Sequence, residues 1–263
     1  MGIDTRKPIV IKIGGSTLGN HDTTLEDLVS LQKRGILPIV VHGGGNKVTE
    51  WLKRQNTPTS FKDGIRITDE HSLEMVAAVL GGLVNTDLVA AMNALGGKSV
   101  GMTGVDGNLT ESKCNDPDLG YAGKVTKVNP EVIQAVLAAG FIPFIAPPGA
   151  KAADEPADIP YVNINGDDIA AALADALHAE KLIFLTDVDG IRDGDGQVLP
   201  KLSANDVKSL MNSGVISGGM IAKAEATLVA LEKTSQVQII DGRSPHALLT
   251  AIEGGAIGTM ITR

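Results

Sequence analysis

Two patterns of apolar residues alternate along the chain. Short aliphatic runs, such as IVIKI at 9–13 and IVV at 39–41, predict buried strands, and apolar residues spaced three or four apart predict helices between them. Strands are expected over 8–13, 36–41, 98–102, 141–146, 182–186, 237–240 and 258–262. Helices are expected over 25–34, 47–55, 69–80, 84–95, 167–178, 205–212, 219–233 and 245–252, with another opening at Pro130. Recurrent strand–helix units favour an α/β fold with a mainly parallel sheet and helices on both faces.

The alternation of strands and helices is interrupted in three segments. TSFKDGIRIT at 59–68 places an Asp-Gly turn between short alternating segments, which predicts a β-hairpin that lies over a site as a flap. Residues 104–128 indicate irregular β-structure. The polar, proline-rich stretch 147–160 predicts a crossing between two lobes. We therefore expect one domain, 1–263, with lobes at 1–160 and 161–263.

Composition and charge limit the classes of partner and the cellular compartment that we expect. The 263 residues carry a formal net charge of −8 and no run of Lys or Arg, which argues against nucleic acid as a partner. Cys114 is the only cysteine, so an intrachain disulfide is excluded and a reducing cytosol is favoured. No signal core and no apolar run near the ~20 residues of a membrane span stand out. We expect a cytoplasmic protein with no membrane partner.

Two glycine-rich strand exits carry the first chemical signal. Lys12 interrupts an apolar strand that ends in Gly14 and Gly15, and a second strand ends in HGGG at 42–45. A lysine in a buried strand has to reach an anion, and glycines let backbone N–H groups approach phosphate oxygens. Neither exit completes a P-loop or a dinucleotide fingerprint, and tight strand-to-helix turns also use glycine. Together with Lys12, the two exits indicate phosphoryl transfer.

Three later segments offer further candidates. YVNINGDD at 161–168 crowds Asn and Asp at a helix start, where capping by Asn165 or Asp167 accounts for only part of the set. TDVDGIRDGDG at 186–196 lacks the glycine and glutamate positions of a calcium loop, which leaves an acidic surface turn or a nucleotide-lining loop. Lys223 lies one turn into a largely apolar helix, a position usually taken by a solvated lysine.

The motifs KIGG, HGGG, GIRIT, NINGD, TDVDG and GMIAK, in this order and spacing, resemble the acetylglutamate kinases of the amino-acid kinase superfamily over nearly the whole chain. The resemblance implies a three-layer α/β/α sandwich that binds the amino-acid substrate in its N-terminal lobe and ATP in its C-terminal lobe. It implies phosphorylation of the side-chain carboxylate of N-acetyl-L-glutamate, in arginine biosynthesis. A carboxylate is already an anionic nucleophile, so this reaction needs alignment and charge neutralisation but no general base.

The resemblance also implies roles for side chains. Lys12 and Lys223 would flank the transferred phosphoryl group, and Asp167 would hold both ammonium groups. Arg66, on the hairpin, would pair with the α-carboxylate of N-acetylglutamate through two hydrogen bonds, and Asn163 would bind the same end of the molecule.

Backbone and pocket residues follow from the same resemblance. The N–H groups of Gly14, Gly15 and Gly44 would bind phosphoryl oxygens, and Gly44 and Gly45 would border the acceptor substrate. Mg²⁺ would be carried mainly by the ATP phosphates, because no cluster of metal ligands stands out. The residues expected to line the ATP pocket are Asp187, Val188, Asp189, Gly190, Ile191, Arg192, Val215, Ile216 and Ser217.

Rival assignments remain at this point. Gly166 stands where the family more often has alanine. A kinase for aminoadipate or glutamate attached to a carrier protein is the nearest rival, and such enzymes tend to differ at the second glycine loop and around the hairpin arginine. Carbamate, aspartate, glutamate 5- and uridylate kinases are more distant. A non-catalytic ligand-sensing domain on the same fold is a different class, against which Lys12, Asp167 and Lys223 together argue.

The expected assembly is a homodimer. Leu73, Val76, Ala77 and Leu80 form one apolar stripe on the helix expected at 69–80, and this stripe would form the dimer contact unless it packs inside its own lobe. Arginine-regulated members of the family carry an extra N-terminal helix. Only residues 1–7 precede the first strand, so we expect no inhibition by arginine.

Overall fold

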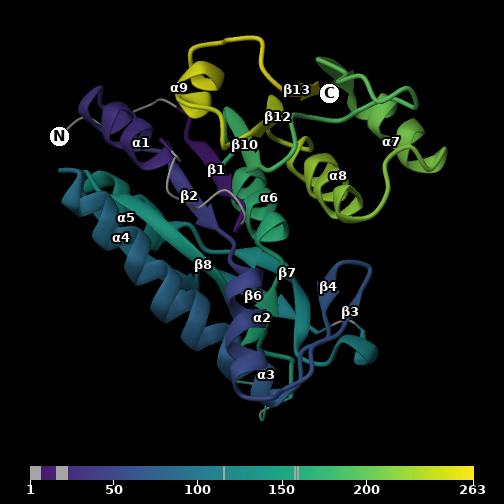
Figure 1. Ribbon diagram of the computed structural model, residues 1–263. Helices are drawn as coiled ribbons and strands as arrows, with labels where there is room; N and C mark the ends of the chain where they lie inside the picture. Colours follow the sequence, from purple (N-terminus) through teal and green to yellow (C-terminus); the bar gives the residue numbers. More distant parts are fainter. Residues whose placement is uncertain (1–6, 16–22, 115, 157, 159) are drawn as a thin grey trace.

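The computed structural model describes residues 7–15, 23–114, 116–156, 158 and 160–263. In these ranges eleven strands form one sheet, and helices cover both of its faces (Figure 1). Ten strands follow the order β11-β13-β12-β10-β1-β2-β8-β6-β7-β9, and β5 pairs with β8. Pairs at the centre of the sheet are parallel, so the predicted α/β/α sandwich is confirmed. The expectation about residues 1–7 concerns residues that, apart from Lys7, lie outside the described part of the chain.

The elements have the following bounds. The strands are β1 (Ile9–Ile13), β2 (Ile39–His42), β3 (Phe61–Lys62), β4 (Ile65–Arg66), β5 (Ser99–Gly104), β6 (Thr110–Lys113), β7 (Ala122–Val128), β8 (Ile142–Lys151), β9 (Val162–Ile164), β10 (Lys181–Thr186), β11 (Lys201–Ser203), β12 (Gln236–Asp241) and β13 (Thr259–Thr262). The helices are α1 (Thr24–Lys33), α2 (Gly45–Arg54), α3 (Glu70–Val76), η1 (Ala77–Val84), α4 (Asn85–Ala94), η2 (Asp106–Asn108), η3 (Pro117–Leu119), α5 (Glu131–Ala138), α6 (Gly166–Ala176), α7 (Ala204–Asn212), α8 (Gly219–Ala230) and α9 (Ala247–Ile252).

The central strand β1 sends its side chains alternately to two cores. Ile11 and Ile13 pack in the core that α1, α2, the long helix η1–α4 and α9 close. Val10 packs in the opposite core, which α6 and α8 close. Because side chains of a strand alternate between faces, Lys12 shares the face of Val10 and points toward α6 and α8.

Strand β8 is longer than the strand expected over 141–146 and takes up the first part of the stretch 147–160. It continues from Ile142 through Pro147 and Pro148 to Lys151, and it is buried along nearly its whole length. Proline is tolerated where a ladder is irregular, and the register of β8 with β5 shifts between Thr103 and Gly104, at the level of these prolines.

The strands β9 and β11 were not predicted, because each has only three residues. β9 begins just past the expected lobe boundary at 160 and pairs with β7 and β8. The division into lobes at 1–160 and 161–263 stays a prediction.

One continuous helix replaces the two expected over 69–80 and 84–95. It runs from Glu70 to Ala94, and its middle part η1 is a π-helix. Gly81 and Gly82 each cost about 1 kcal/mol of helix propensity, but burial of Val79, Leu80 and Val84 outweighs this cost. By length and composition alone this helix could cross a membrane, contrary to the sequence expectation, although core helices meet the same criterion.

The apolar stripe expected to form a dimer contact packs inside its own chain. Leu73, Val76 and Leu80 are at most 5% exposed. Leu80 also lies under the second glycine loop, since a Cβ atom on Gly44 would come within 2.8 Å of its Cδ2 atom. The prediction that this stripe mediates dimerisation is therefore wrong.

The predicted hairpin is confirmed as β3–β4. Asp63 and Gly64 have φ angles of 51° and 80°, which suit the tight turn of a two-residue hairpin loop. Lys62 pairs with Asp116 and Asp118, each at 2.9 Å. These contacts tie the hairpin to the segment before β7.

A histidine–aspartate pair joins α9 to α1. His246 Nδ1 lies 2.7 Å from Oδ1 of the buried Asp27, whose Oδ2 accepts a hydrogen bond from the backbone N–H of Leu249 at 3.3 Å. The hydrogen bond with Asp27 and the charge of its carboxylate raise the pKa of His246 above 6.5. A raised pKa means that the folded state binds the proton more tightly than the unfolded state.

We expect this pair to make stability fall as pH rises. The contribution of His246 is complete below the ordinary histidine pKa and is lost as pH rises through the raised value. Urea unfolding between pH 5 and 9 should show this loss in the parent chain and a flatter profile in His246→Asn. His178 also has a left-handed backbone, so His178→Asn is the control. Equal profiles for the parent and His246→Asn would refute the expectation.

Candidate active site

Two lysines from different elements converge on one carboxylate. Lys12 Nζ on β1 lies 2.7 Å from Asp167 Oδ1, and Lys223 Nζ on α8 lies 3.1 Å from Oδ2. Asn165 caps α6 by accepting a hydrogen bond from the backbone N–H of Asp167 at 3.0 Å. This cap holds the backbone of Asp167, from which the carboxylate side chain extends. Burial by itself raises the pKa of Asp167, but the two ammonium groups outweigh it and hold the pKa below the usual value.

The two glycine loops meet backbone to backbone. A Cβ atom on Gly15 would lie 2.9 Å from both N and Cα of Gly44, so a side chain there would separate the loops. The N–H of Gly14 was expected to bind a phosphoryl oxygen, but it donates to Leu185 O at 2.9 Å. That amide belongs to the sheet, and Gly15 and Gly44 remain as candidates. Gly44 also precedes α2 without a side-chain cap, although the N–H of Lys47 already donates to Gly44 O at 2.9 Å.

A cavity of about 210 Å³ brings together most of the residues expected around the acceptor substrate. It lies between the glycine loops, the hairpin and the start of α6. The expected residues that line it are Lys12, Gly15, Gly44, Gly45, Arg66 and Asn163.

Arg66 is one of the residues that line this cavity. Its Nη2 atom donates to Gly45 O at 2.9 Å and to Thr49 Oγ1 at 2.8 Å, and its guanidinium stacks on Phe61 at 4.7 Å. Nη1 is buried and has no hydrogen-bond partner among the residues that the structure describes. Burial lowers the pKa of Arg66, so the guanidinium would gain from an anion.

Thr68 links the two residues expected to hold the substrate. Asn163 Nδ2 donates to Thr68 Oγ1 at 2.9 Å, and that hydroxyl donates to the carbonyl of Arg66 at 2.8 Å. Thr68 is fully buried. It belongs to the GIRIT motif, but sequence reasoning gave it no role because its partner lies on β9, a strand that was not predicted.

A second cavity, of about 400 Å³, lies at the ends of β10 and β12. All nine residues expected to line the ATP pocket surround it, from Asp187 to Arg192 and from Val215 to Ser217. Sequence reasoning missed four further lining residues: Asp193, Met220, Asp241 and Arg243. A signal for Asp241 was present, because it ends β12 at the level where Asp187 directly follows β10.

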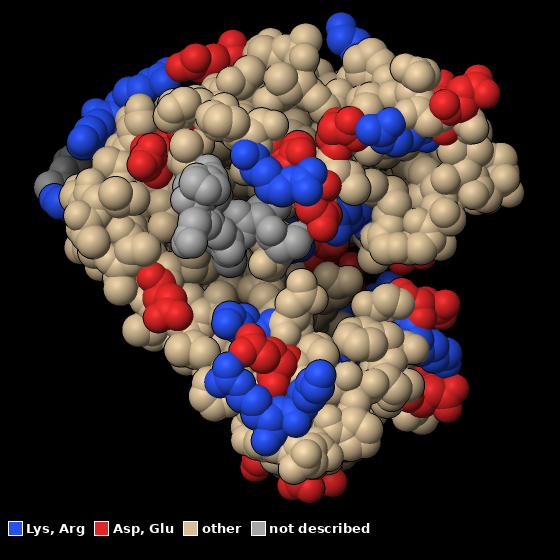
Figure 2. All heavy atoms as spheres, viewed as in Figure 1, with Lys and Arg blue, Asp and Glu red and all other residues tan. Residues whose placement is uncertain are grey.

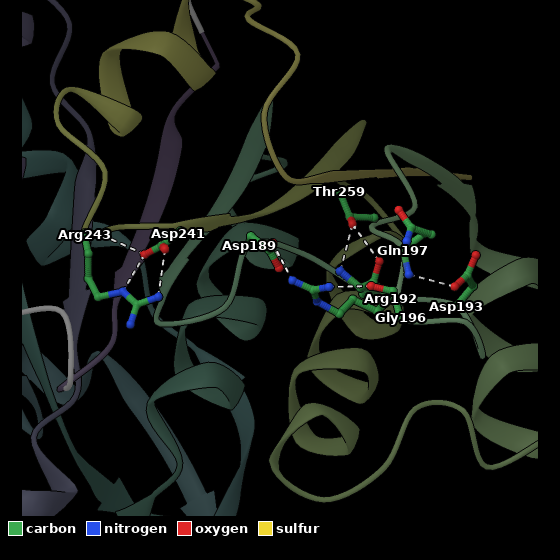
Figure 3. A network of polar contacts seen from close by, with 9 residues as sticks. Asp189, Arg192, Asp193, Gly196, Gln197, Asp241, Arg243 and Thr259 are labelled. Carbon is green, nitrogen blue, oxygen red and sulfur yellow. Dashed lines mark hydrogen bonds and ion pairs between the residues drawn. The ribbon is translucent and has the colours of Figure 1, made fainter.

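Ion pairs hold both arginines of this cavity (Figure 3). Arg243 donates to the two carboxylate oxygens of Asp241 at 2.9 and 2.8 Å, and Arg192 pairs with Asp189 at 2.7 Å. Figure 2 shows acidic and basic side chains interspersed on this face, which is hollowed between α8 and the hairpin.

The cluster of Lys12, Asp167 and Lys223 borders the smaller cavity and lies about one helical turn from the larger one. Lys12 lines the smaller cavity, and Lys223 follows Met220, which lines the larger one, by about one helical turn. Parallel pairing places the exits of β2, β1, β10 and β12 at one edge of the sheet. Ligands of open α/β sheets bind at such an edge, so a substrate in each cavity would meet at the two lysines.

Comparison with known proteins places the chain in a family. Residues 7–241 match the amino acid kinase family. An acetylglutamate kinase from Dehalococcoides mccartyi is 40% identical over 97% of this chain and 94% of its own, and one from Cereibacter sphaeroides is 41% identical over 96% and 87%. The crystal structure of smu.665 from Streptococcus mutans matches with a TM-score of 0.82 and 30% identity, over 97% of this chain and 98% of the other.

These matches, added to the geometry of the cleft, show that the chain belongs to the amino acid kinase family. The family assignment agrees with a site built for moving a phosphoryl group between two anions.

Proposed function

We propose that this chain uses ATP to phosphorylate the side-chain carboxylate of N-acetyl-L-glutamate. The observation that carries the proposal is Arg66, which lines the same cavity as Lys12 and the glycine loops and whose buried Nη1 atom has no hydrogen-bond partner among the described residues. An acceptor with two carboxylates fits this arrangement, because one can pair with Arg66 while the other reaches the lysines. The relatives named acetylglutamate kinase support the same acceptor.

In the proposed reaction, an oxygen of the substrate carboxylate attacks the γ-phosphorus of ATP. A new bond forms to that phosphorus, the bond to the bridging oxygen breaks, and ADP leaves with the electron pair. Lys12 and Lys223 reduce the repulsion between the anions, and Gly15 and Gly44 donate backbone hydrogen bonds to the phosphoryl oxygens. Asp167 orients both ammonium groups and moves no proton, because its oxygens face the lysines and its pKa is lowered.

The nucleotide would occupy the larger cavity, with its phosphates toward Lys223. No group of three or more ligating side chains among the described residues could hold a metal ion. Asp167, the carboxylate nearest the transfer point, is already paired with both lysines. Mg²⁺ would therefore arrive on the ATP phosphates, where it supplies charge neutralisation, with water completing its coordination.

We propose that the protein is a cytoplasmic homodimer. The outward side of the helix from Glu70 to Ala94 carries small exposed residues four apart, and Leu83 beside them is 38% exposed. Only 39% of its most apolar stretch is buried within one chain. Small residues let two helices approach closely, so a second copy of this face would cover the apolar surface. The small residues are Ala78, Gly82, Thr86, Ala90 and Ala94.

Light scattering should therefore give the mass of a dimer, and Leu83→Asp should shift the protein to monomers by burying a charge at the contact. Leu95 is also exposed, at the far end of the same helix, so Leu95→Asp serves as the control. A dimer that persists in Leu83→Asp would place the contact elsewhere.

A substrate panel tests the proposed function directly. Purified protein with MgATP is assayed for ADP release with N-acetylglutamate, glutamate, aspartate, carbamate and UMP. N-acetylglutamate should give the highest kcat/KM by a wide margin. A preference for another acceptor would overturn the substrate assignment, and the absence of ADP release with all five would favour a ligand-sensing domain.

Arg66→Lys should raise the KM for N-acetylglutamate and leave the KM for ATP nearly unchanged. Lysine keeps the charge but loses the planar fork that holds a carboxylate through two hydrogen bonds. Initial rates with each substrate varied in turn measure both constants. Arg54 also stacks on an aromatic ring, Trp51, at 5.3 Å, so Arg54→Lys is the matched control. Equal increases in both KM values would mean that the hairpin has a structural role or that lobe closure couples the two cavities.

A further inference from the structure

A buried chain of hydrogen bonds leads from the long helix to the second glycine loop. Asn85 Nδ2, at the start of α4, donates to the carbonyl of Phe144 on β8 at 2.9 Å and lies 3.0 Å from Nε2 of His42. His42 Nδ1 lies 2.8 Å from the carbonyl of Gly43. His42 is fully buried and Asn85 is 5% exposed. The proposed function assigns a role to neither residue.

The two ends of this chain determine its direction. Phe144 O can only accept, so the amide of Asn85 presents its nitrogen, which then donates to Nε2 of His42. Nε2 is therefore the unprotonated nitrogen, and Nδ1 carries the hydrogen that it donates to Gly43 O. Burial lowers the pKa of His42 to about 4, which keeps the imidazole neutral and preserves this direction at ordinary pH.

The last hydrogen bond fixes a peptide plane. In a trans peptide the C=O and the following N–H point in opposite directions. With the carbonyl of Gly43 held on His42, the N–H of Gly44 has to point away from the imidazole. The opposite side is occupied by the first glycine loop, since Gly44 N lies 2.9 Å from the position of a Cβ on Gly15.

This peptide would otherwise turn easily. Gly44 has a φ angle of 136°, and Gly43 and Gly44 lack the side chains that restrict rotation. The N–H of Gly43 donates to Ile13 O at 2.9 Å, which fixes the preceding peptide but not the one between Gly43 and Gly44. The imidazole supplies the missing restraint.

We propose that His42 and Asn85 are positioning residues that lock the Gly43–Gly44 peptide, so that the N–H of Gly44 is aimed at the transferred phosphoryl group. This inference rests on the proposed phosphoryl transfer. The lock matters most in the transition state, when charge builds on the phosphoryl oxygens, because a preorganised donor needs no reorientation at that moment.

Two substitutions of His42 separate this role from simple packing. In His42→Asn the amide nitrogen falls where Nδ1 was, so the donor to Gly43 remains while the contact with Asn85 is lost. In His42→Gln the amide falls where Nε2 was, so the contact with Asn85 remains while the donor to Gly43 is lost. If the hydrogen bond from His42 to Gly43 O holds the peptide, His42→Asn should keep kcat within about tenfold of the parent, and the kcat of His42→Gln should fall about a hundredfold. A merely structural tie between helix and strand predicts the reverse order.

Asn85 has a matched control on the same helix. Asn93 Oδ1 accepts from the backbone N–H and the hydroxyl of Ser99 at 3.1 and 3.0 Å, on the far side from the glycine loop. Asn85→Ala should lower kcat about tenfold with little change in the KM for ATP, whereas Asn93→Ala should lower Tm and leave kcat unchanged.

The measurements are kcat, both KM values and Tm for the four variants, with ligand-free Tm used to confirm folding. His42→Gln equal to or more active than His42→Asn, or an unchanged kcat in Asn85→Ala, would overturn the lock. The kcat values of His42→Asn and His42→Gln can be compared with whichever acceptor the parent enzyme uses, because the Gly44 amide is proposed to bind the phosphoryl group and not the acceptor. A parent enzyme that prefers another acceptor would therefore refute the substrate assignment while leaving the lock testable.

Discussion

Replacing Asp167 by asparagine should lower kcat by at least a hundredfold and destabilise the ligand-free protein by about 3 kcal/mol. The side chain of Asp167 is 5% exposed, and its carboxylate pairs with Lys12 at 2.7 Å and Lys223 at 3.1 Å. Asparagine has nearly the same shape but no charge, so two ammonium groups are left close together without an anion between them. Their repulsion moves both away from the phosphoryl position. Stopped assays of ADP release and urea unfolding measure the two effects.

Bound nucleotide should partly reverse the loss of stability in Asp167→Asn. The phosphates supply the negative charge that the carboxylate no longer provides, so MgADP should raise Tm more in the variant than in the parent. Asp175, also on α6, pairs with Lys233 at 3.0 Å on the surface, and Asp175→Asn is the control for a helix that loses one carboxylate. A variant with normal kcat, or one that MgADP stabilises less than the parent, would contradict the role given to Asp167.

Local pattern was enough to predict the elements that place the candidate catalytic groups. Lys12 stands out because a charge interrupts a buried strand, and its glycine exit is visible at the same place. The period-two alternation of β1 then decides which face of the sheet Lys12 reaches, and the partner on that face is the start of α6. The role of Lys223 came only from the family resemblance, since a lone lysine on an apolar helix has no distinctive pattern.

The parts that sequence reasoning missed depend on contacts between distant segments. Gly14 reads as a phosphate-binding glycine, but strand pairing commits its N–H to Leu185. Thr68 and Asn85 have hydrogen-bond partners on β9 and β2, and no periodicity along the chain reports such pairings. Two helices were expected on either side of residues 81–83, whereas the structure has one helix whose middle part is a π-helix.

Lys223→Ala should reduce kcat about a hundredfold and change the KM for N-acetylglutamate little. The ammonium group approaches Asp167 Oδ2 from α8, opposite Lys12, and its side chain is 20% exposed. Its charge matters most when negative charge builds between donor and acceptor, and an interaction made mainly in the transition state appears in kcat rather than in KM. Loss of one such contact typically costs ~3 kcal/mol.

Lys233 offers a close control for this prediction. It follows α8 and pairs with Asp175, so Lys233→Ala removes an ion pair between the same two regions but at a surface site. Surface pairs of this kind contribute at most about 1 kcal/mol, and kcat should not change. Steady-state assays of both variants at saturating MgATP make the comparison. A Lys223→Ala enzyme that keeps near-normal kcat would return this lysine to the solvated role that its position on an apolar helix first suggested, and Lys12 alone would then neutralise the phosphoryl group.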